Sequence, residues 1–185
     1  MGKMILASSS PRRAEILKDY KLEIIPSPYV EQHTKTAFSY SYVEDLAYNK
    51  ALAVVPLVEE ESLIIGADTV VILGDEILEK PMDEKDAFLM LKKLSGKTHS
   101  VVTSIAIINS KTKEHKINST TSNVTFKNLS DELIQNYIRD FKPLDKAGSY
   151  GIQELPDGFI EKVEGDLENI IGISSKSFEN LLNEF

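Results

Sequence analysis

Short apolar runs alternate along the chain with polar segments that contain turn residues. In several of these runs the residues are continuously apolar or alternate between apolar and polar, which is typical of β-strands. Gly74 and Asp75 separate two such runs by a two-residue turn, and this predicts a hairpin. The predicted strands cover residues 4–7, 22–25, 63–67, 69–73, 76–78, 99–108, 118–126 and 159–163.

Helices are predicted where a polar cap residue precedes apolar residues at a spacing of three or four. Ser41, with Glu44 three positions later, has the form of a capping box, and the helix that it begins is expected to end before Pro56. Three further helices are predicted over residues 83–94, 131–141 and 175–182. The alternation of strands and helices indicates an α/β or α+β layered domain, and the hairpins imply some antiparallel pairing.

The composition fits one continuous globular unit. A chain of 185 residues is long enough to bury a sizeable core. It has no cysteine, which excludes disulfides, thiol nucleophiles and thiolate metal sites. Because no apolar stretch is long enough for a signal peptide or a membrane helix, we expect a soluble, cytoplasmic protein that does not bind membranes.

The net charge narrows the choice of partners. The chain has 21 basic and 29 acidic residues, a formal charge of −8. A negative charge of this size argues against binding to DNA, RNA or an anionic membrane. A small anion remains compatible if basic groups converge in one cleft, because the local potential depends on nearby charges.

The first polar loop, residues 8–13 with the sequence Ser-Ser-Ser-Pro-Arg-Arg, follows the first predicted strand. Pro11 suits the first position of a helix, and the serines can cap it. The free N–H groups of a helix start favour a phosphate, and Arg12 and Arg13 add forked cationic donors. The segment therefore predicts a phosphate site, while a capped surface helix with solvated arginines accounts for it equally well.

Asp68 stands between two apolar runs, residues 63–67 and 70–72. A carboxylate there is costly unless a cation or hydrogen-bond donors meet it. We interpret Asp68 as the end of a strand that borders a ligand crevice, where it can hold a divalent metal or take a proton from water. The structural alternative is an aspartate in a strand-end turn.

A glycine-containing segment, residues 142–153, is the second candidate for ligand contact. Its glycines allow a ligand to approach the backbone closely, Lys146 can meet a phosphate, and Tyr150 or Gln153 can meet a base. A structural turn is the alternative. Lys50 and Lys80, taken singly, have the character of surface lysines, and residues 165–169 either line the same cleft or form a turn.

Motifs spread over nearly the whole chain form a specific set in their order, although several are weak singly. They are residues 6–13, Glu31, Glu44, Ala47, Lys50, Ala51, 66–69, Lys80, Pro81, 94–96, His99, Val101, Thr103, 145–148, 150–153, Gly165 and Asp166. In this order they resemble the Maf family of nucleoside triphosphate pyrophosphatases.

The resemblance implies a fold, a reaction and a set of site residues. The implied fold is a single α/β domain over residues 1–185, similar to inosine triphosphate pyrophosphatases, in which an elongated mixed sheet is flanked by helices and two lobes surround a deep cleft. The implied reaction cleaves a nucleoside triphosphate between its α and β phosphates, with Mg²⁺ or Mn²⁺ as cofactor, and a homodimer is compatible with the family. The resemblance implies that Asp68 is the proton acceptor and that Glu31 is a further acidic residue, which would share the metal with Asp68. It also implies that Arg13, Lys50 and Lys80 are the cations that bind the triphosphate. Ser8 and Ser10 would act as hydrogen-bond donors in the first loop.

Three positions distinguish the branches of that family. Arg12, Thr69 and Gln153 match the branch that acts on dTTP and UTP, whereas the branch that acts on 7-methyl-GTP tends to have tyrosine, glutamine and glutamate there. The amide of Gln153 can donate to and accept from a thymine or uracil edge. We therefore expect a pyrimidine nucleotide. The alternatives are a 7-methyl-GTP or other modified-nucleotide pyrophosphatase, and a non-catalytic nucleotide-sensing regulator of septum formation.

Overall fold

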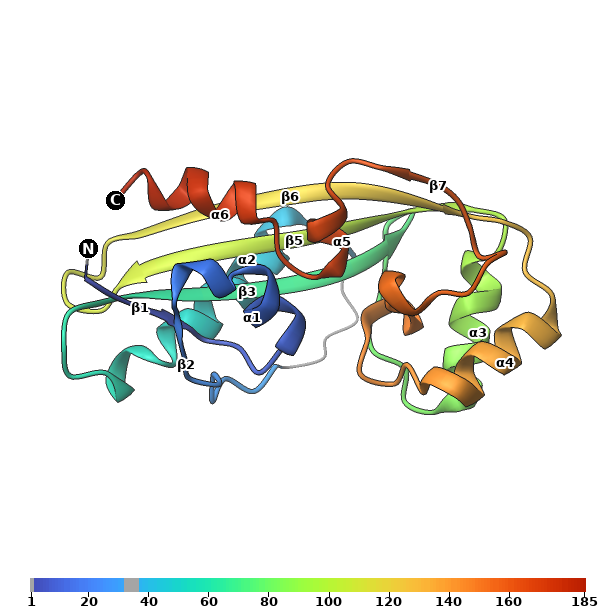
Figure 1. Ribbon diagram of the computed structural model, residues 1–185, viewed down its shortest axis with the longest axis horizontal. Helices are drawn as coiled ribbons and strands as arrows, with labels where there is room; N and C mark the ends of the chain where they lie inside the picture. The colour runs from blue at the N-terminus through green and yellow to red at the C-terminus, as the bar shows by residue number, and fades with distance from the viewer. Residues whose placement is uncertain (1, 32–36) are drawn as a thin grey trace.

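One long mixed sheet organises the protein, and the computed structural model describes residues 2–31 and 37–185 of it (Figure 1). The strand order is β2-β1-β3-β5-β6-β7, and β4 pairs with β3. β1 is parallel to β2 and β3, and the other pairs are antiparallel. The strands are β1 (Lys3–Leu6), β2 (Glu23–Ile24), β3 (Ser62–Leu73), β4 (Glu76–Leu78), β5 (Thr98–Asn109), β6 (His115–Phe126) and β7 (Ile160–Glu164).

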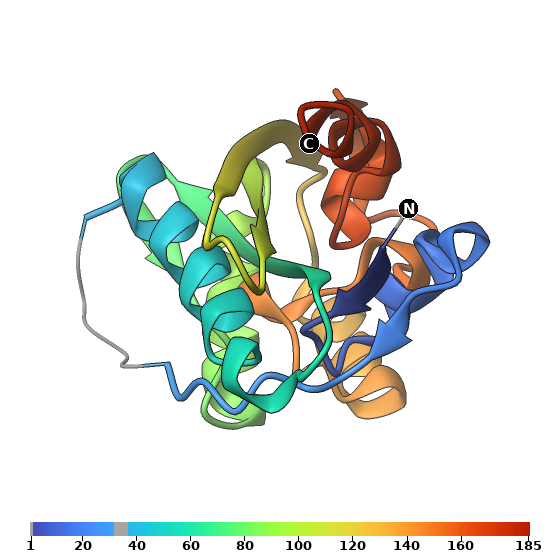
Figure 2. The ribbon, with the colours of Figure 1, turned by 90° about the vertical axis from the view of Figure 1, so that its left-hand side faces the viewer.

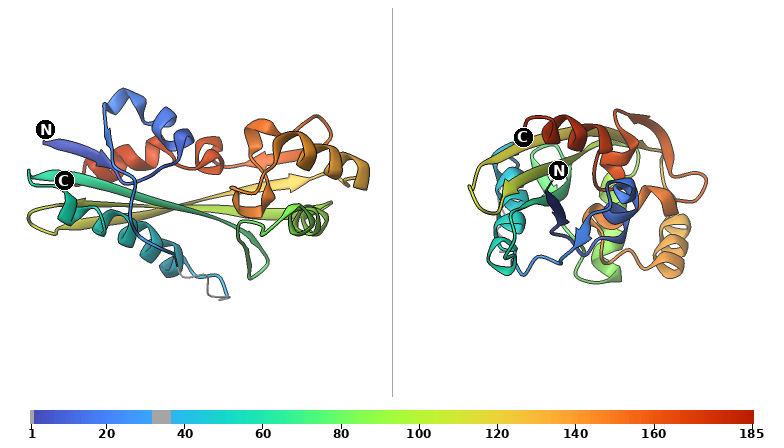
Figure 3. Two further views of the ribbon diagram at one scale, coloured as in Figure 1. Left: turned by 90° about the horizontal axis from the view of Figure 1, so that it is seen from below. Right: turned by 60° about the vertical axis from the view of Figure 1, so that its left-hand side comes forward.

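Helices cover both faces of the sheet. Viewed from below, α2 lies on one side, with α1 and α6 on the other (Figure 3), and the end-on view shows the same division (Figure 2). α3 and α4 pack together at the end of the sheet away from the two termini (Figure 1). The helices are α1 (Pro11–Ile16), α2 (Tyr40–Leu52), α3 (Glu84–Leu94), α4 (Asp131–Phe141), α5 (Leu167–Ile171) and α6 (Ser175–Leu182).

The alternation of side chains along β3 explains why the core has two layers. Ile64 belongs to a buried cluster with Ala51 of α2, whereas Ile65 belongs to a cluster with Phe178 of α6. Successive residues of a strand point to opposite faces, so a central strand that is covered on both faces is apolar throughout. The expected fold class, a mixed α/β sheet flanked by helices, is confirmed.

Most predicted elements lie where the sequence pattern placed them. α4 and α6 have the predicted bounds, and α3 begins one residue later because Asp83 is its N-cap and accepts a hydrogen bond from the Asp86 N–H at 2.7 Å. α5, which begins at the N-cap Asp166, was not predicted as a helix. Among the described helices, none has the length and apolar character needed to cross a membrane.

The prediction that Ser41 caps α2 was wrong. Ser39 is the N-cap, because its backbone is extended and its hydroxyl accepts a hydrogen bond from the Tyr42 N–H at 3.2 Å. Glu44 does not close a capping box, since its carboxylate instead accepts a hydrogen bond from the Ser119 hydroxyl of β6 at 2.9 Å. The helix therefore begins at Tyr40 and ends at Leu52, and Pro56 lies in a separate 3₁₀ turn (Val55–Leu57).

The prediction that Asp68 ends a strand was also wrong. β3 is one continuous strand of twelve residues, and Asp68 lies inside it, opposite Ser104 of β5. The backbone ladder continues because the hydrogen bonds of a strand do not depend on the side chain. Asp68 is only 7% exposed, so its charge is met inside the protein instead of at a strand end.

Candidate active site

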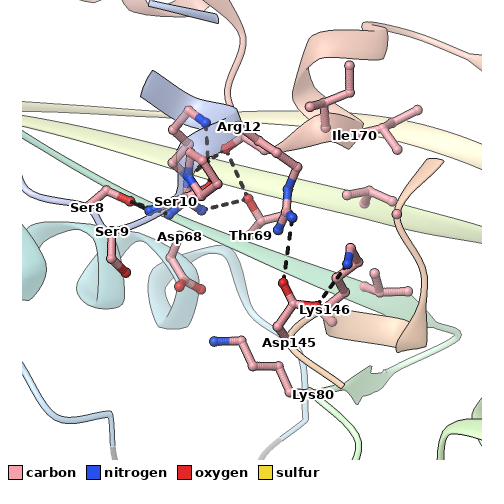
Figure 4. Close-up of a pocket in the computed structure, with 18 of the residues that line it drawn as sticks. Ser8, Ser9, Ser10, Arg12, Asp68, Thr69, Lys80, Asp145, Lys146 and Ile170 are labelled. Atoms are coloured by element: carbon pink, nitrogen blue, oxygen red, sulfur yellow. Dashed lines mark hydrogen bonds and ion pairs between the residues drawn. The ribbon is translucent and has the colours of Figure 1, made fainter. Parts of the chain in front are cut away.

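A cleft of about 400 Å³ opens at the middle of the sheet. It lies between the loop that joins β1 to α1, the centre of β3, and the segment that follows α4. Figure 4 shows that side chains from these elements point toward the same space. All the site residues predicted from the sequence line this cleft, namely Ser8, Ser10, Arg12, Arg13, Glu31, Lys50, Asp68, Thr69, Lys80, Lys146 and Gln153.

Lys50 joins the two carboxylates that the sequence singled out. Its Nζ lies 2.5 Å from Oδ1 of Asp68 and 2.6 Å from Oε1 of Glu31. Desolvation raises the pKa of Asp68 above its ordinary value, while the charges of Lys50 and Arg13 act against that rise. The site thus contains a buried acid whose ionised form depends on one neighbouring ammonium, an arrangement suited to a proton acceptor.

Gly66 is the reason that Lys50 reaches Asp68. α2 crosses β3 so closely that a Cβ at Gly66 would lie 2.2 Å from the carbonyl oxygen of Ala47 and 2.7 Å from the nitrogen of Ala51. Only glycine permits this approach. Lys50 lies in the same turn of α2 as Ala47 and Ala51, and Asp68 lies two positions beyond Gly66 along β3. The missing side chain of Gly66 therefore sets the distance between the ammonium and the carboxylate.

Arg13 is fixed by three hydrogen bonds to other parts of the protein. Its Nε donates to the carbonyl of Gly172 at 2.9 Å, Nη2 donates to the hydroxyl of Thr69 at 3.0 Å, and Nη1 donates to the hydroxyl of Ser8 at 3.4 Å. Desolvation lowers the pKa of Arg13. Ser10 caps α1, as predicted, by accepting a hydrogen bond from the Arg13 N–H at 3.5 Å.

A second group of charges crosses the cleft. Nη1 of Arg12 lies 3.7 Å from Oδ2 of Asp145, and Nζ of Lys146 lies 2.9 Å from Oδ1 of Asp145 and 3.2 Å from Oε2 of Glu154 (Figure 4 shows the contacts of Asp145). Desolvation acts to raise the pKa of Asp145, but the hydrogen bond and charge of Lys146 outweigh it and lower that pKa. Asp145 therefore connects the first turn of α1, through Arg12, to the segment after α4.

Lys80 and Gln153 differ from the other predicted residues because both are exposed at the cleft. Within the described part of the chain, no ion pair is recorded for Lys80, so its ammonium is available to a ligand. Tyr150, the alternative to Gln153 for contacting a base, lines the cleft, but its hydroxyl lies 2.7 Å from Nε2 of the buried His99. The Tyr150 hydroxyl is therefore engaged inside the protein.

Sequence reasoning missed several contributors to the site. Glu154 was not singled out as a partner of Lys146, and nothing in the pattern of side chains identifies the carbonyl of Gly172, because every residue has a carbonyl. Asp145 belongs to the matched motifs and could have been found there. Gly165, Asp166 and Asn169 do not line the cleft. Asp166 caps α5, and Asn169 is a buried residue of that helix.

The donor set suits a hard divalent cation that arrives with its ligand. In residues 2–31 and 37–185, no group of three or more histidine or carboxylate side chains can hold a metal ion by itself. Glu31 and Asp68 nevertheless place carboxylate oxygens around one ammonium, 2.6 and 2.5 Å away. Nucleotide-bound Mg²⁺ is commonly held by one or two carboxylates together with phosphate oxygens. These two residues therefore fit a shared metal–nucleotide site.

A family profile and curated relatives identify the family of this chain. The profile described as Maf-like protein matches residues 3–185. The dTTP/UTP pyrophosphatase of Thermosipho africanus (strain TCF52B) is 48% identical over 92% of this chain and 87% of its own, and that of Thermoanaerobacter sp. (strain X514) is 42% identical over 99% and 97%. A solved nucleoside-triphosphatase / dITP/XTP pyrophosphatase from Mycobacterium abscessus is similar at 14% identity and a TM-score of 0.49, covering 98% of this chain and 93% of its own. On the family profile and these relatives, the chain belongs to the Maf-like proteins.

Proposed function

We propose that this protein is a nucleoside triphosphate pyrophosphatase that hydrolyses dTTP and UTP to the monophosphate and pyrophosphate. The observation that carries the proposal is the cluster of Asp68, Lys50 and Glu31 in the same cleft as Arg13 and Lys80. A buried acid surrounded by cations suits the attack of water on a phosphate. Relatives at 42% and 48% identity have the name dTTP/UTP pyrophosphatase, which supports the same activity here.

Asp68 is the proton acceptor in the proposed mechanism. A water oxygen attacks the α phosphorus, the bond between that phosphorus and the bridging oxygen breaks, and the proton of the water passes to Asp68. Lys50 favours the ionised form of Asp68 before this step, and its Nζ lies 2.5 Å from Oδ1, close enough to hold the carboxylate in place. Pyrophosphate leaves with the bridging oxygen.

Arg13, Lys50, Lys80 and Lys146 supply the positive charge that binds the triphosphate, and Ser8 and Ser10 contribute donors in the first loop. Glu31 and Asp68 would hold Mg²⁺ or Mn²⁺, whose chemistry is to neutralise charge on phosphate oxygens. Losing one positioned cation or donor in such a site costs on the order of a hundredfold in rate. Electrostatic stabilisation is therefore expected to contribute more to the rate than proton transfer alone.

The identity of the base is assigned from three residues. Gln153 is exposed at the cleft and its amide can both donate to and accept from O4 and N3–H of a pyrimidine. Arg12 and Thr69, the other two positions that match the pyrimidine branch, line the same cleft. The rival substrates are 7-methyl-GTP and other modified nucleotides. We further propose that the enzyme acts in the cytoplasm on small nucleotides, as a homodimer.

The test is a panel of dTTP, UTP, 5-methyl-UTP, CTP, GTP and 7-methyl-GTP, with pyrophosphate release measured with and without EDTA. We expect turnover of dTTP and UTP that EDTA abolishes and Mg²⁺ or Mn²⁺ restores. Preference for 7-methyl-GTP would overturn the substrate assignment. Nucleotide binding without release of pyrophosphate would favour the regulatory alternative.

Asp68→Asn tests the assigned base. We expect the variant to fold and to lose at least about a hundredfold in kcat, since general-base catalysis contributes roughly this much. Asp45→Asn is the matched control, because Asp45 is an exposed residue of α2 that does not line the cleft. Full activity of Asp68→Asn would remove Asp68 from its role.

A further inference from the structure

The orientation of Arg13 depends on hydrogen bonds that it makes within the protein. Three of its five N–H donors bond to the protein, at Gly172, Thr69 and Ser8. One N–H therefore remains on each terminal nitrogen, and because Arg13 lines the cleft these two donors can meet a ligand there. Whatever fixes the three internal hydrogen bonds also fixes the direction of the remaining two.

Thr69, which accepts from Arg13, is itself held by a buried threonine. Its Oγ1 lies 2.8 Å from Oγ1 of Thr103, a residue of β5 that is 1% exposed and does not line the cleft. The Thr103 hydroxyl donates to the carbonyl of Asn169 at 3.0 Å. Thr103 and Thr69 are paired across the strands β5 and β3, so their side chains stand on the same face of the sheet.

The direction of each hydrogen bond between Arg13, Thr69, Thr103 and Asn169 follows from counting hydroxyl protons. The carbonyl of Asn169 can only accept, so the single hydroxyl proton of Thr103 points to it. The proton between Thr103 and Thr69 must then belong to Thr69. Thr69 is left with lone pairs for the proton on Nη2 of Arg13, at 3.0 Å. The order is Arg13 to Thr69 to Thr103 to the Asn169 carbonyl.

The last residue in this series of hydrogen bonds, Asn169, is held against the sheet. Asn169 is fully buried, and its Nδ2 donates to the carbonyl of Val101 and to the hydroxyl of Ser122, each at 3.0 Å. The side chain of Asn169 therefore fixes the position of its own carbonyl against β5 and β6. α5, which contains Asn169, is followed by Gly172, whose carbonyl accepts from Nε of Arg13.

We propose that Thr103 is a positioning residue for the phosphate groups of the substrate, acting through the Thr69 hydroxyl on the guanidinium of Arg13. The proposal rests on the proposed function, in which Arg13 binds the triphosphate. Without the Thr103 hydroxyl, the Thr69 proton has one acceptor left, the carbonyl of Gly172 at 3.3 Å, which Nε of Arg13 already uses. That carbonyl can accept both bonds, so the Thr69 proton turns fully toward it. The lone pairs of Thr69 then turn away from Nη2 of Arg13, and the guanidinium loses one of the three bonds that fix its orientation.

The test compares Thr103→Val, which keeps the shape but removes the hydroxyl, with Thr103→Ser, which keeps the hydroxyl. Turnover of dTTP with Mg²⁺ and calorimetric binding of pyrophosphate are measured for both and for the wild type. For Thr103→Val we expect kcat/KM to fall about ten- to a hundredfold, as for a misplaced binding group, and pyrophosphate to bind more weakly. Thr103→Ser should stay within about twofold of the wild type.

A double-mutant cycle separates positioning from a merely structural role. In the Arg13→Lys background, Thr103→Val should cause little further loss, because the residue through which it acts is already changed. Losses that multiply would overturn the proposal, as would a folded Thr103→Val with kcat/KM within twofold of the wild type. If Thr103→Val does not fold, Thr103→Ala replaces it and is judged by the same thresholds. If neither variant folds but Thr103→Ser does, the hydroxyl is needed for folding, and the proposal is overturned.

The binding measurement keeps the inference distinct from the proposed function. If the wild type turns over none of the nucleotides, the proposed activity fails, and pyrophosphate binding alone decides the role of Thr103. Weaker binding by Thr103→Val but not by Thr103→Ser would then support the positioning role. Equal binding by all three proteins would overturn it.

Discussion

The close crossing of α2 over Gly66 makes Gly66→Ala the most direct perturbation of the candidate site. The new Cβ would lie 2.2 Å from the carbonyl oxygen of Ala47, whereas real Cβ contacts essentially never fall under 3.0 Å, so α2 must move by at least about 0.8 Å. The obstacles at Ala47 and Ala51 include backbone atoms, which cannot rotate away. The helix therefore shifts as a unit, and Lys50 moves with it.

The shift should lower both stability and activity. Overpacking of this kind costs about 1–3 kcal/mol. For a chain of this length each kcal/mol lowers Tm by about 2–4 °C. Lys50 now lies 2.5 Å from Asp68, and a displacement near 1 Å in a catalytic pair costs on the order of a hundredfold in rate. We expect kcat for dTTP to fall by about that factor, even at temperatures where the variant is folded.

The assay measures thermal melting and dTTP turnover for Gly66→Ala beside Gly2→Ala. Gly2 is the matched control, because a Cβ there would meet only the carbonyl oxygen of Glu61 at an ordinary 3.6 Å. Gly2→Ala should behave as the wild type. If Gly66→Ala also melted and turned over dTTP as the wild type does, the close approach of α2 would not be what places Lys50.

Two further predictions concern titratable groups near the cleft. Burial lowers the pKa of His99 to about 4, so the contribution of the neutral imidazole to the free energy of unfolding is complete above the unfolded pKa of 6.5 and is lost as the pH falls through about 4. In urea melts at pH 7 and pH 4, the wild type should lose up to roughly 3 kcal/mol of unfolding free energy on acidification, a loss that His99→Gln should not show. His115→Gln, at an exposed histidine, is the control and should follow the wild type. Asp145→Asn should lower KM for dTTP about two- to fivefold at low salt, because it removes the carboxylate that competes with the substrate for Arg12. The effect should be smaller at high salt, which screens the charges. A KM that does not change at any ionic strength would contradict this.

Local patterns predicted those parts of the structure that depend on neighbouring residues in the chain. The serines 8–10 were recognised as possible caps, and Ser10 is the one that caps α1, because capping requires only the next three residues. α4 has its predicted bounds because its apolar spacing and its polar ends agree. The cap of α2 was misplaced because Ser39 and Ser41 both suit the position. Sequence spacing could not show that Glu44 bonds to Ser119, 75 residues away.

The candidate site was predicted in its members but not in its contacts. The resemblance brought Lys50 and Asp68 into one cleft, yet the sequence offered no sign that their distance depends on a glycine under α2. Asp68 was placed at a strand end because an isolated carboxylate is too costly in a strand interior. A cation supplied by a helix on the sheet face removes that cost, and such a partner is invisible to periodicity.

The charges of the cleft bear on how nucleotide and metal bind together. Among residues 2–31 and 37–185, the charged side chains that line it are five cations (Arg12, Arg13, Lys50, Lys80 and Lys146) and four carboxylates (Glu31, Asp68, Asp145 and Glu154), a balance of one positive charge. A triphosphate carries several more negative charges than this balance can neutralise, and a divalent cation would offset part of the excess. Glu31 and Asp68, which would hold that cation, are already paired with Lys50, so phosphate oxygens would supply most of its ligands. Each should therefore raise the affinity of the other by the same factor, which calorimetric titration of Mg²⁺ with and without a non-hydrolysable dTTP analogue would measure, and independent binding of the two would refute this account of the cleft.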